Sequence, residues 1–389
     1  MKIHRFSEGD TLERVAEENG ISVDTLRLYN DISDIPPALG EELAILTPTR
    51  TYRTVANDTL ERISLRFAVK KSRLISINPG LGEGVLPVGR EVALRFGERA
   101  FGTALGNGYF YPECTRERLD MIMPYLTYVT FCVAHFSGEK IELLDFDRAA
   151  LGDAVSAGKI PLLRIYEQDK REKYKSPDKF IGECIRVATE GGFKGITINL
   201  EDEESYERAA ELLINMRREL LGCDLILITE VGEGIRYDLS DYSDGSVVCY
   251  PKYAMEKRKA FNDGERAFFS EFADRAESAK CFIDLPALAV SSGRYFDIGR
   301  LLKTARRERA KIEYDEEKML SSVTLGAQKY TFTPLSNIKA ILDTVNEYGY
   351  MGISFDIMRI PMPYLYAYGT MFSTMAYSGI VEHSSCREA

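Results

Sequence analysis

From about residue 100 onward the chain alternates short apolar segments with helical stretches, an order that predicts a parallel sheet with helical crossovers. Eight segments are predicted as strands: Thr103–Tyr111, Tyr128–Phe136, Ile160–Glu167, Gly195–Glu201, Leu225–Val231, Ser246–Tyr250, Cys281–Ala289 and Gly352–Ile357. This number of strands over the remaining length favours a closed (β/α)₈ TIM barrel over an open doubly wound sheet. Residues 291–333 are more than one helix requires and predict a small α+β insertion between strands seven and eight.

The N-terminal part of the chain contains an internal repeat. At an offset of 48 residues, Asp10-Thr11-Leu12-Glu13-Arg14 aligns with Asp58-Thr59-Leu60-Glu61-Arg62, and Asn30 aligns with Asn78. After a one-residue insertion, Leu39-Gly40 matches Val88-Gly89. Each unit predicts a strand, two helices and a closing strand, with Asp10 or its neighbour capping the first helix. We expect units at 1–48 and 49–97, followed by a barrel at 98–389.

Composition restricts the partners. The formal net charge of −10 and the pI near 5.2 argue against nucleic acid, anionic lipid and anionic wall polymers as ligands. No apolar run is long enough to span a membrane, and the first residues encode no secretory signal. Seven scattered cysteines and three distant histidines predict neither a metal site nor another cofactor. The run Arg306–Arg309 is predicted to be a solvated helix face.

The fourth predicted strand carries a polar row. Its alternation places Thr197, Asn199 and Glu201 on the inner face of the barrel, and its apolar residues against the helices. Barrel interiors are usually filled by apolar side chains, and active sites lie at the carboxyl ends of barrel strands. The row therefore predicts a site at the end of this strand.

The repeated units resemble LysM modules, whose pattern is a strand, Gly-Asp-Thr-Leu, a helix, Leu-x-x-x-Asn and a final strand. The first unit has Gly9-Asp10-Thr11-Leu12, and the second has Asn57 where Gly is usual. The resemblance implies binding of N-acetylglucosamine polymers, peptidoglycan or chitin, in a groove between the Asp-Thr-Leu turn and the loop after the second helix. Because the chain is acidic, we expect a neutral sugar backbone as the ligand. A role as a spacer or protein contact stays open.

The barrel resembles the family 18 glycoside hydrolases, and more closely the LysM-bearing N-acetylglucosaminidases that lyse the spore cortex, with their sporulation relatives. The residues that carry this resemblance are Gly108-Tyr109-Phe110-Tyr111-Pro112, Met123-Pro124-Tyr125-Leu126-Thr127-Tyr128, Ile312–Glu316, Ser336–Ala340 and Gly352-Ile353-Ser354. The resemblance implies synthesis in the mother cell and association with the spore coat or cortex.

The resemblance also assigns roles at the site. Glu201 holds the position of the acid that protonates the glycosidic oxygen while the substrate's own acetamide attacks, an exception to the usual carboxylate pair. Asn199 stands where the family has an Asp that stabilises the acetamide, and Tyr250 keeps the contact to that group. Pro251 replaces an acidic residue, and Asp356 replaces the Trp below the sugar. An active N-acetylglucosaminidase and a glycan-binding pseudoenzyme of the spore coat are both consistent with this pattern.

The remaining candidates are predicted from their places at strand ends. Expected substrate-binding residues are Thr197, Tyr109, Tyr111, Glu167 and Asp356. The carboxylates Glu167, Glu230, Asp284 and Asp356 either line the mouth or pair with arginines such as Arg164 and Arg359. The aromatic segment 363–372 either stacks on sugar rings or packs the last helix against the barrel.

Overall fold

The computed structural model describes residues 1–82, 84–97, 102–137, 140–167, 172–200, 205–232, 239–249 and 264–372, with only the backbone of Glu167, Glu172 and Ser240. Eight parallel strands close into a barrel in the order β5, β6, β8, β9, β10, β11, β12 and β18, and β18 pairs with β5. These strands are β5 (Leu105–Phe110), β6 (Tyr128–Phe136), β8 (Ile160–Glu167), β9 (Gly195–Leu200), β10 (Ile226–Val231), β11 (Gly245–Val248), β12 (Cys281–Asp284) and β18 (Gly352–Asp356). The predicted TIM barrel is therefore confirmed.

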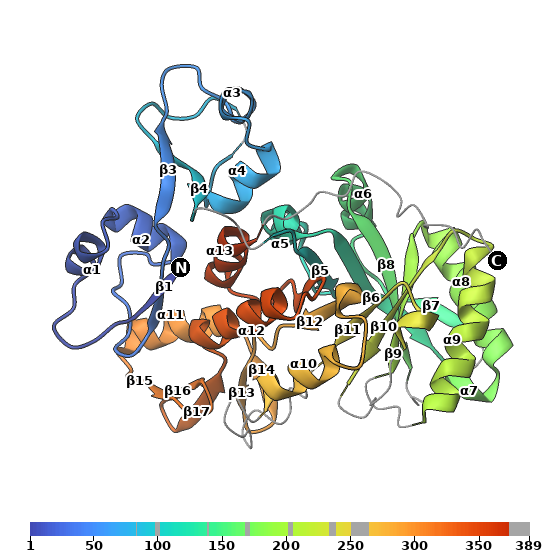
Figure 1. Ribbon diagram of the computed structural model, residues 1–389. Coiled ribbons are helices and arrows are strands. Elements are labelled where there is room, and N and C mark those ends of the chain that lie inside the picture. Colours follow the sequence, from blue (N-terminus) through green and yellow to red (C-terminus); the bar gives the residue numbers. More distant parts are fainter. Residues whose placement is uncertain are drawn as a thin grey trace.

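Helices surround the barrel on its outer side (Figure 1). They are α5 (Arg116–Ile122), α6 (Arg148–Ser156), α7 (Glu172–Lys175), α8 (Pro177–Gly191), α9 (Tyr206–Leu221), α10 (Glu265–Ala273), α12 (Leu335–Glu347) and α13 (Met362–Met371), whereas α11 (Ile298–Glu308) belongs to the insertion between strands seven and eight. Short 3₁₀ turns are η1 (Met123–Tyr125), η2 (Ser240–Tyr242) and η5 (Ser278–Lys280), and the short strand β7 (Ile141–Leu143) pairs antiparallel with β6. Most of the larger helices bury one face against the strands, as expected for amphipathic helices of a barrel.

Side chains fill the interior of the barrel. A buried apolar cluster there contains Tyr128, Leu162, Ile228, Val247, Cys249 and Phe282. Polar side chains lie at the same level, because Asn107 is in register with Tyr128 and Thr130 with Leu162. Thr130 donates a hydrogen bond of 2.7 Å to Asn107, which donates one of 3.0 Å to Ser354. The barrel is thus a packed core of mixed apolar and polar side chains.

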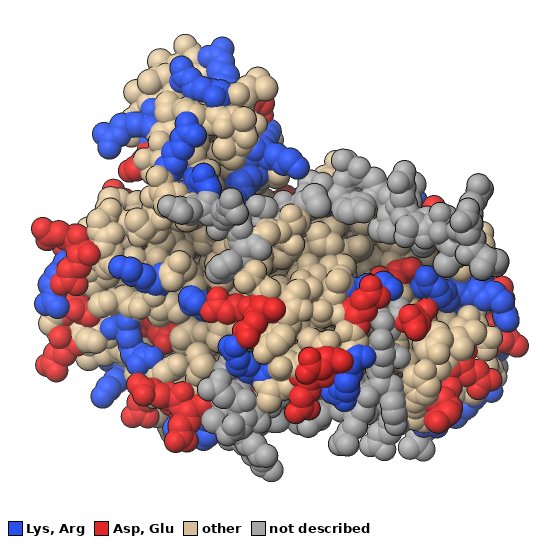
Figure 2. All heavy atoms as spheres, viewed as in Figure 1, with Lys and Arg blue, Asp and Glu red and all other residues tan. Residues whose placement is uncertain are grey.

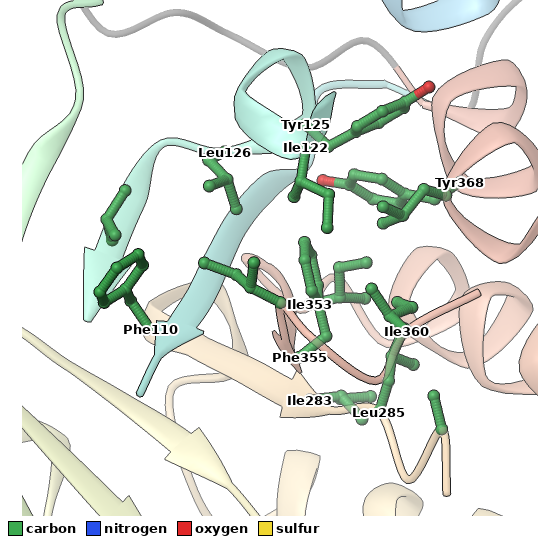
Figure 3. Close-up of a cluster of buried hydrophobic side chains, with 14 of the residues drawn as sticks. Phe110, Ile122, Tyr125, Leu126, Ile283, Leu285, Ile353, Phe355, Ile360 and Tyr368 are labelled. Carbon is green, nitrogen blue, oxygen red and sulfur yellow. The ribbon is translucent and has the colours of Figure 1, made fainter. Parts of the chain in front are cut away.

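Apolar side chains on the outer face of strands β5, β12 and β18 belong to one buried core with residues of η1 and α13. Figure 3 shows Phe110, Ile283, Ile353 and Phe355 on these strands, directed towards the segment around Ile122 to Leu126 and towards Tyr368. Tyr364, Tyr366 and Tyr368 of α13 are all buried. The aromatic segment therefore packs the last helix, the second of its two predicted roles.

An antiparallel sheet follows the seventh barrel strand. It has the order β14 (Arg294–Phe296), β13 (Ala289–Ser291), β17 (Gln328–Phe332), β16 (Leu320–Leu325) and β15 (Ile312–Asp315), with α11 between β14 and β15. The α+β insertion is therefore confirmed. The prediction of one long strand, Cys281–Ala289, was wrong, because β12 ends at Asp284 and Ala289 opens β13. Pro286 lies between them and has no N–H for a ladder bond.

The two N-terminal units have the same fold. Unit 1 consists of β1 (Lys2–Arg5), α1 (Leu12–Glu18), α2 (Val23–Tyr29) and β2 (Glu42–Ile45). Unit 2 consists of β3 (Pro48–Arg53), α3 (Leu60–Phe67), α4 (Lys71–Ile77) and β4 (Glu91–Phe96). In each unit the two strands pair antiparallel around a small core of their own.

The repeated polar residues explain this common fold. The Asn30 amide donates to the carbonyls of Leu26 and Ala44 and accepts from the Ala44 N–H, so it ties the end of α2 to β2. Asn78 makes the same three bonds in unit 2. Thr11 caps α1, which confirms the neighbour of Asp10 as the cap. Asn57 has φ +67°, so it takes the left-handed conformation for which Gly is usual.

Both units are docked on the rest of the chain. In unit 1 the Glu41 carboxylate accepts from the Arg306 guanidinium of α11, with the Nη2 to Oε1 distance at 2.5 Å, and both side chains are almost fully buried. In unit 2 the Ser76 carbonyl accepts a hydrogen bond of 2.7 Å from Tyr125 of η1. The prediction of a solvated face was wrong for Arg306, because its guanidinium is held between α11 and unit 1.

Candidate functional site

The carboxyl ends of four neighbouring barrel strands lead into segments that the structure does not describe, namely 168–171, 201–204, 233–238 and 250–263. Glu201 and Tyr250 therefore lie outside the described residues, and of Glu167 only the backbone is given. The site is consequently described from the last inward side chains that precede these segments.

A buried ion pair crosses the inner face of β9. Arg164 on β8 donates from Nε to Glu230 Oε1 at 2.7 Å and from Nη2 to Glu230 Oε2 at 2.6 Å. The two residues lie on either side of β9 in the sheet, since Arg164 is in register with Thr197 and Glu230 with Asn199. This bidentate geometry satisfies both charges in a dry environment, where an isolated charge would be very costly.

The polar row of β9 lies beside this ion pair. Thr197 is fully buried, and its hydroxyl has no hydrogen-bond partner within the described ranges. Asn199 is half-buried, and its backbone carbonyl accepts a hydrogen bond of 3.2 Å from Lys173 of α7. The row thus ends next to the undescribed segment that begins at residue 201.

Tyrosines border the ion pair from the strands β5 and β8. Burial raises the pKa of Tyr109 well above its ordinary value, and the nearby Glu230 carboxylate raises it further. Burial likewise raises the pKa of Tyr111. Arg164 lies 4.4 Å from the centroid of the Tyr166 ring, and burial raises the pKa of Tyr166 to about 12. At neutral pH these phenols are uncharged donors and acceptors, suited to hydroxyl and acetamide groups.

Asp356, at the end of β18, supports the turn that follows the strand. Its Oδ1 accepts from the Met358 and Arg359 N–H groups at 2.9 and 3.2 Å, and its Oδ2 lies 3.2 Å from the Arg359 guanidinium. Its charge is also one of those that raise the pKa of Tyr111, so Asp356 lies near the tyrosine cluster. Asp284, on β12, is buried and adds to the rise of the Tyr109 pKa.

Five of the eight predicted site residues have described side chains. Tyr109, Tyr111, Thr197 and Asn199 lie around one ion pair, and Asp356 lies near Tyr111. Of the two alternatives for the strand-end carboxylates, pairing with an arginine is found for Glu230 and Asp356. Tyr166 was not among the predicted residues. The alternation Leu162, Arg164, Tyr166 along β8 was the signal that could have found it.

Family comparison identifies the N-terminal units. The model described as "LysM domain" matches residues 4–45 and 52–94. The chain carries two LysM domains. The matched segments coincide with the two docked units, so each LysM domain keeps the hydrogen bonds of its repeated Asn.

Solved structures share the fold of this chain, two of them over nearly its whole length. The spore cortex-lytic enzyme SleL of Bacillus cereus is similar over 96% of this chain and 98% of its own, with a TM-score of 0.71 and 16% identity. SleL of Bacillus megaterium QM B1551 gives a TM-score of 0.72 at 16% identity, with 96% and 99% covered. A chitinase from Chromobacterium violaceum covers 69% of this chain and 99% of its own, with a TM-score of 0.60 and 13% identity.

No curated protein is detectably similar in sequence to this chain. Among the described residues, none of the helices is long and apolar enough to cross a membrane.

Proposed function

We propose that this protein binds N-acetylglucosamine-containing glycan, either peptidoglycan or chitin, through its LysM domains and acts on it with a glycoside hydrolase-like barrel. Two LysM domains support the binding. The fold is shared with two spore cortex-lytic enzymes over nearly the whole chain and with a chitinase over 69% of it. On the same grounds we propose association with the spore coat or cortex, no nucleic-acid or membrane ligand, and domain limits near residues 48 and 97.

The proposed activity is that of an N-acetylglucosaminidase using substrate-assisted retaining hydrolysis. Glu201 is the acid, Asn199 accepts from the acetamide N–H, and Tyr250 assists it. The observation that supports this activity most is the polar row of Thr197 and Asn199 on the inner face of β9, which leads to residue 201. A general acid must carry a proton, and a nearby unpaired cation would favour the ionised carboxylate instead. The charge of Arg164 is neutralised by Glu230, so it does not by itself prevent protonation of a carboxyl group at position 201.

A second candidate is a pseudoenzyme that binds the glycan without cleaving it, as a coat or morphogenetic component. Asn199 favours it, because an amide brings no negative charge to the cation that forms from the acetamide. Asp356 favours it as well, because its carboxylate is occupied by Arg359 and by the turn after β18.

The two candidates differ in the products they release. The protein is incubated with muramic-δ-lactam cortex glycan, and the fragments are analysed by mass spectrometry. The enzyme releases N-acetylglucosamine-ended fragments, and Glu201→Gln abolishes them while glycan binding persists. Retention of the glycan with no fragments establishes the pseudoenzyme, and failure to bind peptidoglycan or chitin refutes both candidates.

A further inference from the structure

The two LysM domains carry opposite charge. Residues 1–48 contain four Lys and Arg against ten Asp and Glu, whereas residues 49–97 contain nine against four. The formal charges are therefore −6 and +5, within a chain of net charge −10. Figure 2 shows mainly Lys and Arg on the visible face of the second domain, which forms the upper lobe. The second LysM domain is thus basic although the chain as a whole is acidic.

One pair of equivalent positions shows how the charge is arranged. In the first domain Arg14 forms an ion pair with Glu18 one helical turn later, at 3.1 Å. The equivalent residues of the second domain are Arg62 and Arg66, two like charges at the same spacing on α3. Such a pair destabilises a helix by a few tenths of a kcal/mol, while the pair in the first domain stabilises it. The second domain therefore has two cations on this helix face where the first has an ion pair.

The guanidinium groups are held by contacts within the second domain. Arg62 donates to the Asn57 carbonyl at 2.8 Å, and Arg66 donates to the Tyr52 hydroxyl at 2.7 Å. Arg50 lies 5.3 Å from the centroid of the Phe67 ring. A nearby carboxylate is that of Asp58, which accepts a 2.6 Å hydrogen bond from the same Tyr52 hydroxyl, and the charges of Arg66 and Arg62 contribute to lowering its pKa. Because these contacts already restrict the three side chains, binding a ligand through their remaining N–H donors costs little further side-chain entropy.

Exposed apolar side chains lie on the loop to which Arg62 is bonded and on the loop that pairs with it. The loops 54–59 and 85–89 meet through the Thr59 to Val85 bridge and through the Gly89 N–H, which donates to the Thr54 carbonyl at 2.8 Å. On these loops Val55, Val85 and Val88 are 50%, 68% and 71% exposed. The corresponding loop of the first domain is held against α11 and β15, where Glu41 binds Arg306 and Ile312 donates to the Leu39 carbonyl.

We propose that the second LysM domain binds a glycan that bears carboxylates, with Arg50, Arg62 and Arg66 as the anion-recognising residues and the first domain as a docked support. The carboxylates are those of peptidoglycan peptide stems, which chitin lacks. This inference rests on the proposed function and replaces the neutral ligand expected from the net charge. Guanidinium groups and exposed valines on one domain suit a polymer that has both apolar sugar faces and acidic branches.

The test measures co-sedimentation of the full chain with three insoluble probes: peptidoglycan sacculi, the same sacculi with their carboxyl groups amidated, and chitin. Arg66→Glu installs the residue found at the equivalent position of the first domain, so the helix is expected to fold at least as well. We expect this variant to bind native sacculi roughly tenfold more weakly at low salt, and the difference to shrink as NaCl is raised. Arg218→Glu, at an exposed position on α9, makes the same change in net charge and should leave binding unaltered.

The outcomes separate this inference from the proposed function. Weaker binding of the wild-type protein to amidated sacculi and to chitin supports carboxylate recognition. Equal binding to native and amidated sacculi, with Arg66→Glu unaffected, overturns the inference and leaves glycan binding intact. Failure to bind all three probes refutes the proposed function itself. Preferential capture of single-stranded RNA over native sacculi overturns the inference in favour of a nucleic-acid ligand.

Discussion

Replacing Arg306 by Met removes the charge that the first LysM domain binds on α11. The side chain of Arg306 is 5% exposed and that of Glu41 is 2% exposed. The guanidinium group also donates to the Asp31 and Asn30 carbonyls at 2.7 and 3.2 Å. The substitution therefore leaves a buried carboxylate and two carbonyls without their main donor.

The expected cost follows from this burial. Removing one partner of a buried ion pair destabilises a protein by about 3–5 kcal/mol, because the remaining charge is desolvated without compensation. Lys303 and Asp31 form a second ion pair across the same interface at 2.7 Å, but both side chains are more than half exposed. An exposed pair is worth about 0–1 kcal/mol, so Lys303→Met is a control for the loss of one positive charge at this place.

Urea unfolding gives the free energy of each variant, and limited proteolysis reports whether the first domain separates from the barrel. We expect Arg306→Met to shift unfolding by several kcal/mol and to expose residues 1–48 to cleavage, while Lys303→Met resembles the wild type. The double variant with Glu41→Met should recover most of the loss, because two apolar side chains can pack where the charges were. If Arg306→Met costs no more than Lys303→Met, the reasoning from burial is refuted.

Three further predictions concern single residues. Burial lowers the pKa of Lys159 to about 8, so the unfolded state binds more protons between pH 8 and 10.5, and stability should rise with pH there by up to about 3 kcal/mol. Lys159→Met should lack that rise. Both proteins contain the same buried tyrosines, so the difference between their free energies of unfolding in urea at each pH removes the contribution of tyrosine ionisation. A Cβ on Gly40 would lie 2.0 Å from the Ile312 carbonyl oxygen, whereas the equivalent Gly89 has open space at a similar φ. Gly40→Ala should therefore destabilise by at least about 2 kcal/mol more than Gly89→Ala, measured by thermal unfolding, and equal losses would contradict the close approach. Asn199→Asp should raise glycan hydrolysis about 10²- to 10³-fold if the missing charge limits the rate, and an unchanged rate of fragment release would exclude that explanation.

Much of the fold could be predicted because buried positions recur in the sequence as a regular pattern of apolar residues. Each barrel strand buries apolar side chains on both faces, so strands such as Tyr128–Phe136 and Ile160–Glu167 were placed with the bounds that the structure has. Short antiparallel strands at the surface leave a weaker trace. In the insertion, β14 and β16 were therefore missed, and β13 was merged with the preceding strand.

The candidate site shows a different limit. Alternation assigned Thr197 and Asn199 to the inner face, but it says nothing of which side chains meet across the barrel. The Arg164 to Glu230 pair joins strands that are not neighbours in the sheet. The sequence therefore indicated that such a pair could form, but it did not give the geometry of the pair. Arg306 gave a misleading signal, because a charge run on a helix is normally solvated, and only the docked domain supplies the partner that permits burial.

The internal repeat separates the residues that determine the LysM fold from those with other roles. Positions that keep their identity, such as Asn30 and Asn78, make the same internal hydrogen bonds in both domains. Some positions that differ make contacts outside the core of their own unit or add to its surface charge: Glu41 binds the barrel domain, whereas Arg66, where the first domain has Glu, adds to the positive charge of the second. Because both domains must fold by the same rules, these differences reflect what each domain contacts. On this argument the first domain has changed towards docking and the second towards a ligand, so substitutions at Glu41 should alter stability and substitutions at Arg66 should alter binding.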